Sequence, residues 1–101
     1  MFNPYWDDKD AFLRFEFVDD IVFAHAQVPT WNKRVYIKCL AIWSEAKREL
    51  KELGYNDIFV IIPTGDKKLI KFEQTFGFTP LINSDKYLIM VCNNIGEDHG
   101  N

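Results

Sequence analysis

An acid and a base in the N-terminal part of the sequence have the types and spacing to remove a proton from an amine. Two runs of alternating residues, 12–18 and 21–28, are separated by two aspartates, which predicts a β-hairpin with Arg14 opposite His25. This register places His25 diagonal to Glu16 on one face of the sheet. Because an imidazole titrates near physiological pH, His25 or Glu16 is a candidate general base. The alternative is a half-exposed sheet histidine with a satisfied hydrogen bond.

A further candidate acid lies in the second half of the chain. Apolar residues recur at helical spacing after Asp66, which can cap a helix that ends near Gly77. Glu73 falls within this segment. It is either a solvent-facing helix residue or a buried carboxyl whose raised pKa would suit a general acid. The buried side of the helix is expected to comprise Leu69, Phe72 and Phe76.

The segment from Asn32 to Tyr36 is a candidate anion site. It begins a long predicted helix, so its first backbone N–H groups lack intrahelical acceptors and the helix dipole favours negative charge there. Lys33 and Arg34 add two positive charges. The alternative is that both are solvated charges on an exposed first turn.

Four further elements position these residues. The long helix is expected over 33–53, with Gly54 as its left-handed C′ residue. Residues 57–62 form a β-branched run without alternation, which predicts a central strand covered on both faces. The last two strands are expected at 78–82 and 86–92. The apolar stripe of the long helix comprises Tyr36, Cys39, Leu40, Trp43, Ala46, Leu50 and Leu53.

The order of elements predicts the fold class. A strand, a crossover helix and another strand require a parallel pair with a right-handed connection, and the flanking hairpins add antiparallel neighbours. We therefore expect an α/β (α+β) protein with a mixed, mostly antiparallel sheet, a central parallel pair and two main helices.

Length and charge exclude several classes of protein. The 101 residues predict a single domain over 1–92, followed by a flexible polar tail over 93–101. A formal net charge of −3 gives no general attraction to nucleic acid or to an anionic membrane. No apolar run is long enough to span a membrane, and the first residues lack the features of a signal peptide, so a cytoplasmic location is expected.

The cysteines and the remaining aromatic residues predict packing. Cys39 and Cys92 have no metal-ligand spacing, so we expect no metal site and two reduced, mostly packed thiols; a nucleophilic Cys39 is the alternative. Several aromatic residues have no assigned partner. They either close the core or form a patch that binds another protein, whereas a nucleic-acid platform would need a basic groove. These residues are Phe2, Tyr5, Trp6 and Trp31.

The segment from about Ile21 to Phe78 resembles the core of the GCN5-related N-acetyltransferase (GNAT) family. The chain reads FAHAQVP, then a helix from Lys33, then DIFVIIP and DKKLIKFEQTFGF. The family's late signature, Asn-x-x-Ala-x-x-Phe-Tyr-x-x-x-Gly-Phe, aligns on Gly77-Phe78. The corresponding residues are Asp66 for the Asn, Leu69 for the Ala, Phe72 for the Phe and Glu73 for the Tyr.

This resemblance implies a function. The family's pyrophosphate loop usually contains glycines, which residues 30–36 lack, and few residues precede the first strand, so the chain resembles a minimal or degenerate member. The resemblance implies an acetyl-CoA-dependent N-acetyltransferase-like protein whose acceptor is an amine-bearing small molecule or protein. Catalysis would use Glu16, His25 and Glu73. The coenzyme-binding residues would be Val28, Asn32, Lys33, Arg34, Val35, Tyr36 and Asp66.

Two other functions are compatible with the same sequence. One is a non-catalytic GNAT-like module that binds a protein through its aromatic surface, by analogy with compact proteins of phage genomes. The other is a homodimer formed through the edges of the sheet.

Overall fold

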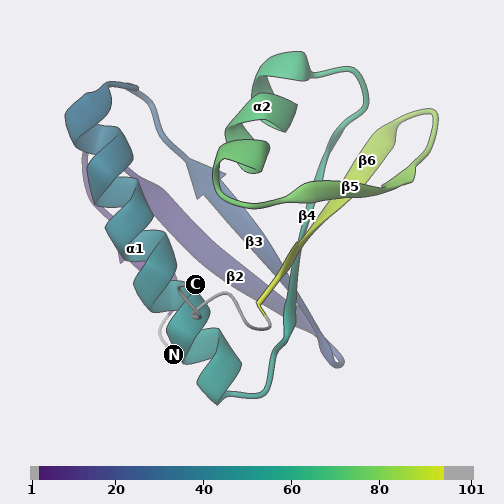
Figure 1. Cartoon of the computed structure of the whole chain (residues 1–101), viewed down its shortest axis with the longest axis horizontal. Coiled ribbons are helices and arrows are strands. Elements are labelled where there is room, and N and C mark those ends of the chain that lie inside the picture. Colours follow the sequence, from purple (N-terminus) through teal and green to yellow (C-terminus); the bar gives the residue numbers. More distant parts are fainter. Residues whose placement is uncertain (1–2, 95–101) are drawn as a thin grey trace.

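The computed structural model describes residues 3–94 and contains a six-stranded sheet with two helices (Figure 1). The strand order is β1-β2-β3-β4-β6-β5, and every pairing is antiparallel except that of β3 with β4. The predicted fold class is confirmed. The helices are α1 (Lys33–Glu52) and α2 (Lys67–Thr75). The strands are β1 (Trp6–Asp7), β2 (Phe12–Val18), β3 (Ile21–Gln27), β4 (Asp57–Pro63), β5 (Thr79–Asn83) and β6 (Tyr87–Asn93).

The β2–β3 hairpin has the predicted register. Arg14 lies opposite His25, and Phe15 lies opposite Ala24. The turn places Asp19 at φ 54, a left-handed conformation that aspartate tolerates better than most residues. Alternation then sends Phe15 and its same-face neighbours into the core, against α1.

Helix α1 begins and ends where the sequence predicts, to within one residue. The Asn32 side chain caps it by accepting from the Val35 N–H, and Gly54 follows the C-cap at φ 101. One stripe of the helix is buried: Val35, Cys39, Trp43, Ala46 and Leu50. The predicted stripe is wrong at Leu40 and Leu53, which are exposed, and it omitted Val35. Trp43 anchors this stripe to the second helix region, because its indole N–H donates to the Phe76 carbonyl at 3.0 Å.

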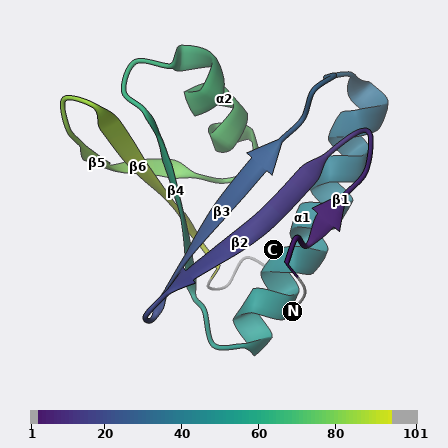
Figure 2. The same ribbon diagram turned by 180° about the vertical axis from the view of Figure 1, so that it is seen from behind.

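Strands β3 and β4 diverge soon after they meet. Their pairing has one registered position, Phe23 with Phe59, and beyond it the two strands separate into a V (Figure 1). Figure 2 shows the same opening from behind, with α1 against the β2–β3 arm. No β3 residue beyond Phe23 is registered with β4.

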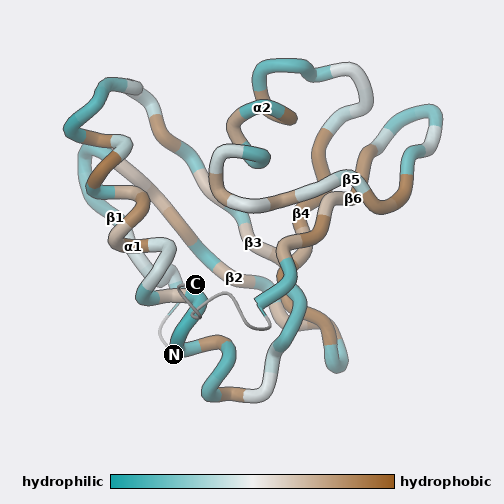
Figure 3. Tube along the Cα trace, in the orientation of Figure 1, coloured by the Kyte–Doolittle hydropathy of each residue, from teal (hydrophilic) through white to brown (hydrophobic). Residues whose placement is uncertain are grey.

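The structure corrects one expectation for β4, which was predicted to be covered on both faces. Hydrophobic residues do follow one another along this strand (Figure 3). Ile58, Val60 and Ile62 are buried beneath the helices, but Ile61 on the opposite face is 51% exposed. Both helices pack on the same side of the sheet, so the other side of β4 has no covering element among the described residues.

Element boundaries differ slightly from those expected. Strand β3 ends at Gln27, and β5 starts at Thr79, because the Phe78 N–H bonds the Glu73 carbonyl at the end of α2. Strand β6 includes Asn93, and Asn94 is buried with its side-chain amide donating to the Lys47 carbonyl at 2.6 Å. These two asparagines therefore belong to the fold, and the rest of the expected tail, residues 95–101, lies outside the described residues, as does Phe2.

Candidate functional site

A groove of about 860 Å³ opens where β3 ends beside α2. Val28 and Pro29 continue from β3 along one side, and α2 forms the other. Apolar side chains alternate with charged ones along this lining. The lining residues are Ala26, Gln27, Val28, Pro29, Trp31, Asp66, Lys68, Leu69, Lys71, Phe72 and Thr75. An elongated ligand with an apolar part and an anionic part would match this lining.

Positive charge dominates the rim of the groove. Lys68 and Lys71 are exposed on α2, one helical turn apart. Lys33 lines a neighbouring hollow of about 360 Å³, which shares Trp31 and Thr75 with the groove. The three lysines therefore line two adjoining hollows, where their positive charges favour a polyanion.

Asp66 is the acidic residue of the groove lining, and its carboxylate is already engaged. Its Oδ1 accepts from the Leu69 N–H at 3.1 Å, which is the helix cap that the sequence predicts. The Asp66 carboxylate therefore serves as the N-terminal cap of α2. Direct coenzyme contact by Asp66 remains a prediction.

The start of α1 supplies fewer donors than the sequence suggests. Asn32 occupies two of the candidate amides: its Oδ1 accepts from Val35 at 2.9 Å, and its carbonyl accepts from Tyr36 at 2.9 Å. The first-turn amides of Lys33 and Arg34 have no intrahelical acceptor. Any anion at this helix end would therefore be held by two amides.

Arg34 does not turn toward the groove. Its guanidinium contacts Asp10 at 3.1 Å, and Lys38 contacts the same carboxylate at 3.0 Å. These hydrogen bonds raise the pKa of Arg34 and lower that of Asp10, with the Arg34 bond as the largest cause for Asp10. We expected Lys33 and Arg34 to bind an anion together. In the structure only Lys33 lines the hollow, because Arg34 pairs with Asp10.

Trp31 forms a wall between the two helices. Its half-exposed ring contacts Tyr36, Phe72 and Phe76 edge-on, with centroids 5.7, 5.5 and 6.2 Å away. Such edge-to-face packing fixes the ring while leaving part of it open to a ligand. Trp31 therefore packs against three aromatic side chains, which could not be assigned to it from the sequence. Tyr5 also closes the core, against Phe15 at 5.9 Å.

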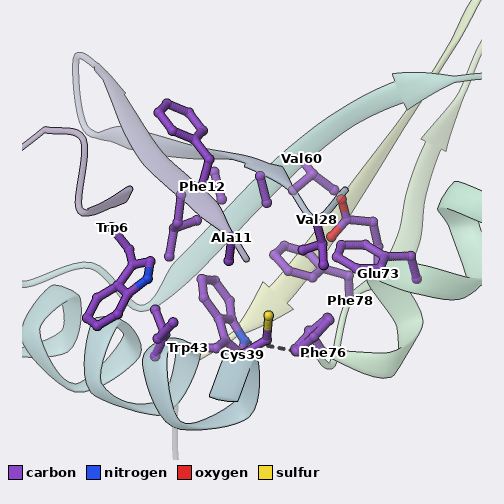
Figure 4. Close-up of a pocket in the computed structure, with 15 residues that line it drawn as sticks. Trp6, Ala11, Phe12, Val28, Cys39, Trp43, Val60, Glu73, Phe76 and Phe78 are labelled. Carbon is purple, nitrogen blue, oxygen red and sulfur yellow. Dashed lines mark hydrogen bonds between the residues drawn. The ribbon is translucent and has the colours of Figure 1, made fainter. Parts of the chain in front are cut away.

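Glu73 is buried, so its solvent-facing interpretation is wrong. The residue is 8% exposed and lines an apolar cavity of about 50 Å³ that shares Val28 and Phe72 with the groove. Figure 4 shows its carboxyl directed toward Val28 and Val60. At the end of α2, the Glu73 backbone carbonyl accepts from the N–H groups of Phe76 and Phe78, which holds the backbone at this residue.

The surroundings of Glu73 change its acidity. Burial raises the pKa of its carboxyl from 4.5 to about 7, and no other group contributes to the shift. The carboxyl is therefore substantially protonated at neutral pH and can donate a proton. Its neighbours in the cavity are apolar or aromatic, and no side-chain hydrogen bond to the carboxyl occurs among residues 3–94.

This raised pKa predicts an unusual dependence of stability on pH. Between pH 4.5 and 7 the folded chain binds more protons at Glu73 than the unfolded chain, so stability falls as pH rises. We expect the free energy of unfolding to fall by about 3 kcal/mol across this interval. Urea melts of the wild type and of Glu73→Gln at several pH values measure it. Equal slopes in the two proteins would contradict the burial of a titrating carboxyl.

The Glu16–His25 pair has the predicted geometry. His25 Nε2 lies 2.9 Å from Glu16 Oε1, and both side chains are about half exposed. The pair is on the side of the sheet opposite the helices. His25 follows Phe23, the last β3 residue registered with β4, so it lies beside the opening of the V. An amine reaching the V from this side would meet the pair first.

Cys39 is a packed thiol, as the helical stripe predicts. It is 8% exposed, and burial raises its pKa, which lowers the thiolate fraction. We expect both Cys39 and Cys92 to resist Ellman's reagent in the native state and to react after unfolding. Stoichiometric reaction of the folded protein within minutes would show that the packing of α1 is different.

Three groove residues were not predicted as site residues from the sequence: Lys68, Lys71 and Trp31. The spacing of the two lysines on a predicted helix was a usable signal. What the sequence could not show is that α2 faces the end of β3, because the two segments are about forty residues apart and no local pattern links them.

Comparison with known proteins was made by sequence and by structure. No protein-family model matches the chain, and no curated protein matches its sequence. Solved structures do match. The ribosomal-protein-S18-alanine N-acetyltransferase from Escherichia coli aligns with a TM-score of 0.61 at 17% identity, over 88% of this chain and 65% of that one. A putative acetyltransferase from Salmonella typhimurium, solved with its cofactor acetyl-CoA, aligns with a TM-score of 0.63 at 14% identity, over 87% and 60%.

This chain has the GNAT acetyltransferase fold. An uncharacterized protein from Bacillus halodurans shares it, with a TM-score of 0.60 at 17% identity over 83% of this chain. The chain spans about half to two thirds of the length of these three proteins. In the described residues no helix is long and apolar enough to cross a membrane.

Proposed function

We propose that this chain is a minimal GNAT-fold acetyltransferase that binds acetyl-CoA in the groove and transfers its acetyl group to an amine. The observation that supports this most is the lysine-rimmed groove at the V between β3 and β4. An acetyl-CoA-bound neighbour shares the fold, which is compatible with the proposal.

The residues of the groove fit the chemistry of this coenzyme. Lys33, Lys68 and Lys71 would hold its phosphates, assisted by the two open amides at the start of α1. Val28, Leu69 and Phe72 offer an apolar wall for the arm that ends in the thioester. When bound, acetyl-CoA supplies an acetyl group already activated as a thioester.

Two groups of the chain would handle protons on opposite sides of the V. His25, positioned by Glu16, would take the proton of the attacking amine. Glu73 holds a proton on its carboxyl at neutral pH and would give it to the leaving sulfur. Backbone N–H groups at the end of β3, beyond its registered pair with β4, would polarise the carbonyl oxygen.

An assay for thiol release tests the proposed activity. The purified chain is incubated with acetyl-CoA and a panel of amines comprising a polyamine, a peptide with a free N-terminus and an aminoglycoside. Free thiol appearing only in the presence of one amine class supports the proposal and names the acceptor. No release with any acceptor would leave the non-catalytic, protein-binding alternative.

A further inference from the structure

A small cavity adjoins the groove, and nothing in the transfer proposed above occupies it. It has a volume of about 50 Å³ and shares Ala26, Val28 and Phe72 with the lining of the groove. Figure 4 shows Val28, Val60 and Glu73 together at one side of it. A ligand that lies in the groove can therefore extend its end into the cavity, next to the Glu73 carboxyl.

Small side chains on the β2–β3 arm create this cavity. Ala11 precedes β2, and Ala24 and Ala26 lie two residues apart on β3, so both point to the side of the sheet that carries the helices. The opposite walls are made of large side chains from α1 and α2, including Trp43 and Phe72. Protein interiors hold few voids larger than a water molecule, so an apolar void beside a groove is a candidate site for the apolar end of a ligand.

The volume of the cavity limits that end to a few carbon atoms. An apolar cavity of about 150 Å³ in another protein takes up benzene, which has six carbons. By the same ratio, a cavity of about 50 Å³ suits about two carbons. This size matches the chain of a propionyl or butyryl group, which is one or two carbons longer than that of acetyl.

The lining of the cavity favours an uncharged chain. Its side chains are apolar or aromatic apart from Cys39 and Glu73, and among residues 3–94 no lysine or arginine lines it. A carboxylate at the end of the ligand would be buried there without a cationic partner, which is unfavourable. Glu73 itself tolerates a hydrocarbon neighbour, because burial raises the pKa of its carboxyl to about 7 and leaves it largely uncharged below that pH.

We propose that the cavity receives the hydrocarbon chain of a short, uncharged acyl-CoA, so that this protein prefers propionyl or butyryl groups to acetyl. The inference rests on the proposed function, in which Glu73 gives its proton to the leaving sulfur. Because the acyl carbon is bonded to that sulfur, its chain starts beside the cavity. In the transfer the amine nitrogen bonds the acyl carbon and the carbon–sulfur bond breaks, while His25 takes the amine proton and Glu73 protonates the sulfur.

Calorimetric titration with a series of acyl-CoAs tests this preference without any acceptor. Because each buried CH₂ group strengthens binding about fourfold, propionyl-CoA should bind about fourfold more tightly than acetyl-CoA. Butyryl-CoA should bind at least as tightly as propionyl-CoA. Hexanoyl-CoA should bind no more tightly than butyryl-CoA, because its chain exceeds the cavity, and succinyl-CoA should bind more weakly than acetyl-CoA because its chain carries a charge.

Two substitutions in the cavity should change this order in opposite directions. Val60→Ala enlarges the cavity and should raise the affinity for hexanoyl-CoA relative to butyryl-CoA by about fourfold or more. Ala24→Val fills it and should remove the preference for butyryl-CoA over acetyl-CoA. Val22→Ala is the matched control, because Val22 is also buried but does not line the cavity, and it should keep the wild-type order. Circular dichroism confirms that each variant is folded.

The possible outcomes separate this inference from the proposed function. Equal affinity for acetyl-, propionyl- and butyryl-CoA would overturn the inference and leave acetyl-CoA binding in place. A steady rise in affinity through hexanoyl- and octanoyl-CoA would also overturn it, because a chain on the open surface has no length limit. The wild-type order in a folded Val60→Ala variant would place the acyl chain elsewhere. If CoA and all of its thioesters fail to bind, the proposed function is overturned together with the inference.

Discussion

Glu73→Gln is expected to lower acetyl transfer about 100-fold while changing the affinity for acetyl-CoA less than about twofold. The amide keeps the shape of the carboxyl but cannot give a proton to the leaving sulfur. Because the pKa of Glu73 is about 7, wild-type turnover should also fall as pH rises through 7, and this limb of the profile should vanish in the variant. Single-turnover thiol release at pH 6 to 9 measures both effects.

Glu52→Gln controls for the general effect of removing a carboxylate. Glu52 lies at the far end of α1, is exposed, and bonds Arg48 at 2.7 Å. Its variant should keep wild-type turnover and the same pH profile. Unchanged turnover in Glu73→Gln would show that another group, or water, protonates the leaving sulfur, and the buried carboxyl would then be a structural feature alone.

The double substitution Lys68→Glu/Lys71→Glu is expected to weaken binding of CoA by about 100-fold or more. Each charge-assisted contact with a phosphate contributes about 1.5 to 3 kcal/mol, and each reversal adds repulsion. Both side chains are exposed, so the fold should survive the change. Calorimetric titration of the folded variant with CoA measures the loss.

Lys9→Glu/Lys86→Glu makes the same change in net charge away from the groove. Lys9 precedes β2, and Lys86 lies in the turn before β6. If a general field attracts the coenzyme, both double variants should lose similar affinity. If the groove binds it, the control should retain nearly all of its affinity. Equal losses would therefore argue against a site on α2.

Local patterns were enough to predict most of the fold. Alternation fixed the β2–β3 register because a one-residue slip would move Phe15 out of the core. Helix α1 was predictable from its stripe, its Asn32 cap and Gly54. The order of strand, helix and strand then predicted the parallel pairing of β3 with β4.

The site was less predictable because it depends on contacts between distant segments. From helical periodicity alone, Phe72 is expected to face the core and Glu73 can be either exposed or buried. The structure buries Glu73, because α2 packs with this residue facing Val28 and Val60. Arg34 is likewise predicted as an anion ligand from the sequence, but in the structure it pairs with Asp10. Pairing over such distances leaves no trace in a single sequence.

The side of β4 away from the helices shows a different limit. The apolar run of β4 correctly indicates a strand that is apolar on both sides, but it does not say what covers the second side. Burial by a helix of the same chain and burial by another molecule require the same residues. Ile61 on this side of β4 is 51% exposed, so no helix among the described residues buries it.

The central claim is that the groove between β3 and α2 binds acetyl-CoA, and isothermal titration of the purified chain with acetyl-CoA tests it directly. We expect saturable binding of one molecule per chain with a Kd below about 100 µM, competition by CoA, and weaker binding as salt rises, because lysines hold the phosphates. The absence of saturable heat with about 1 mM acetyl-CoA at low salt would contradict the account.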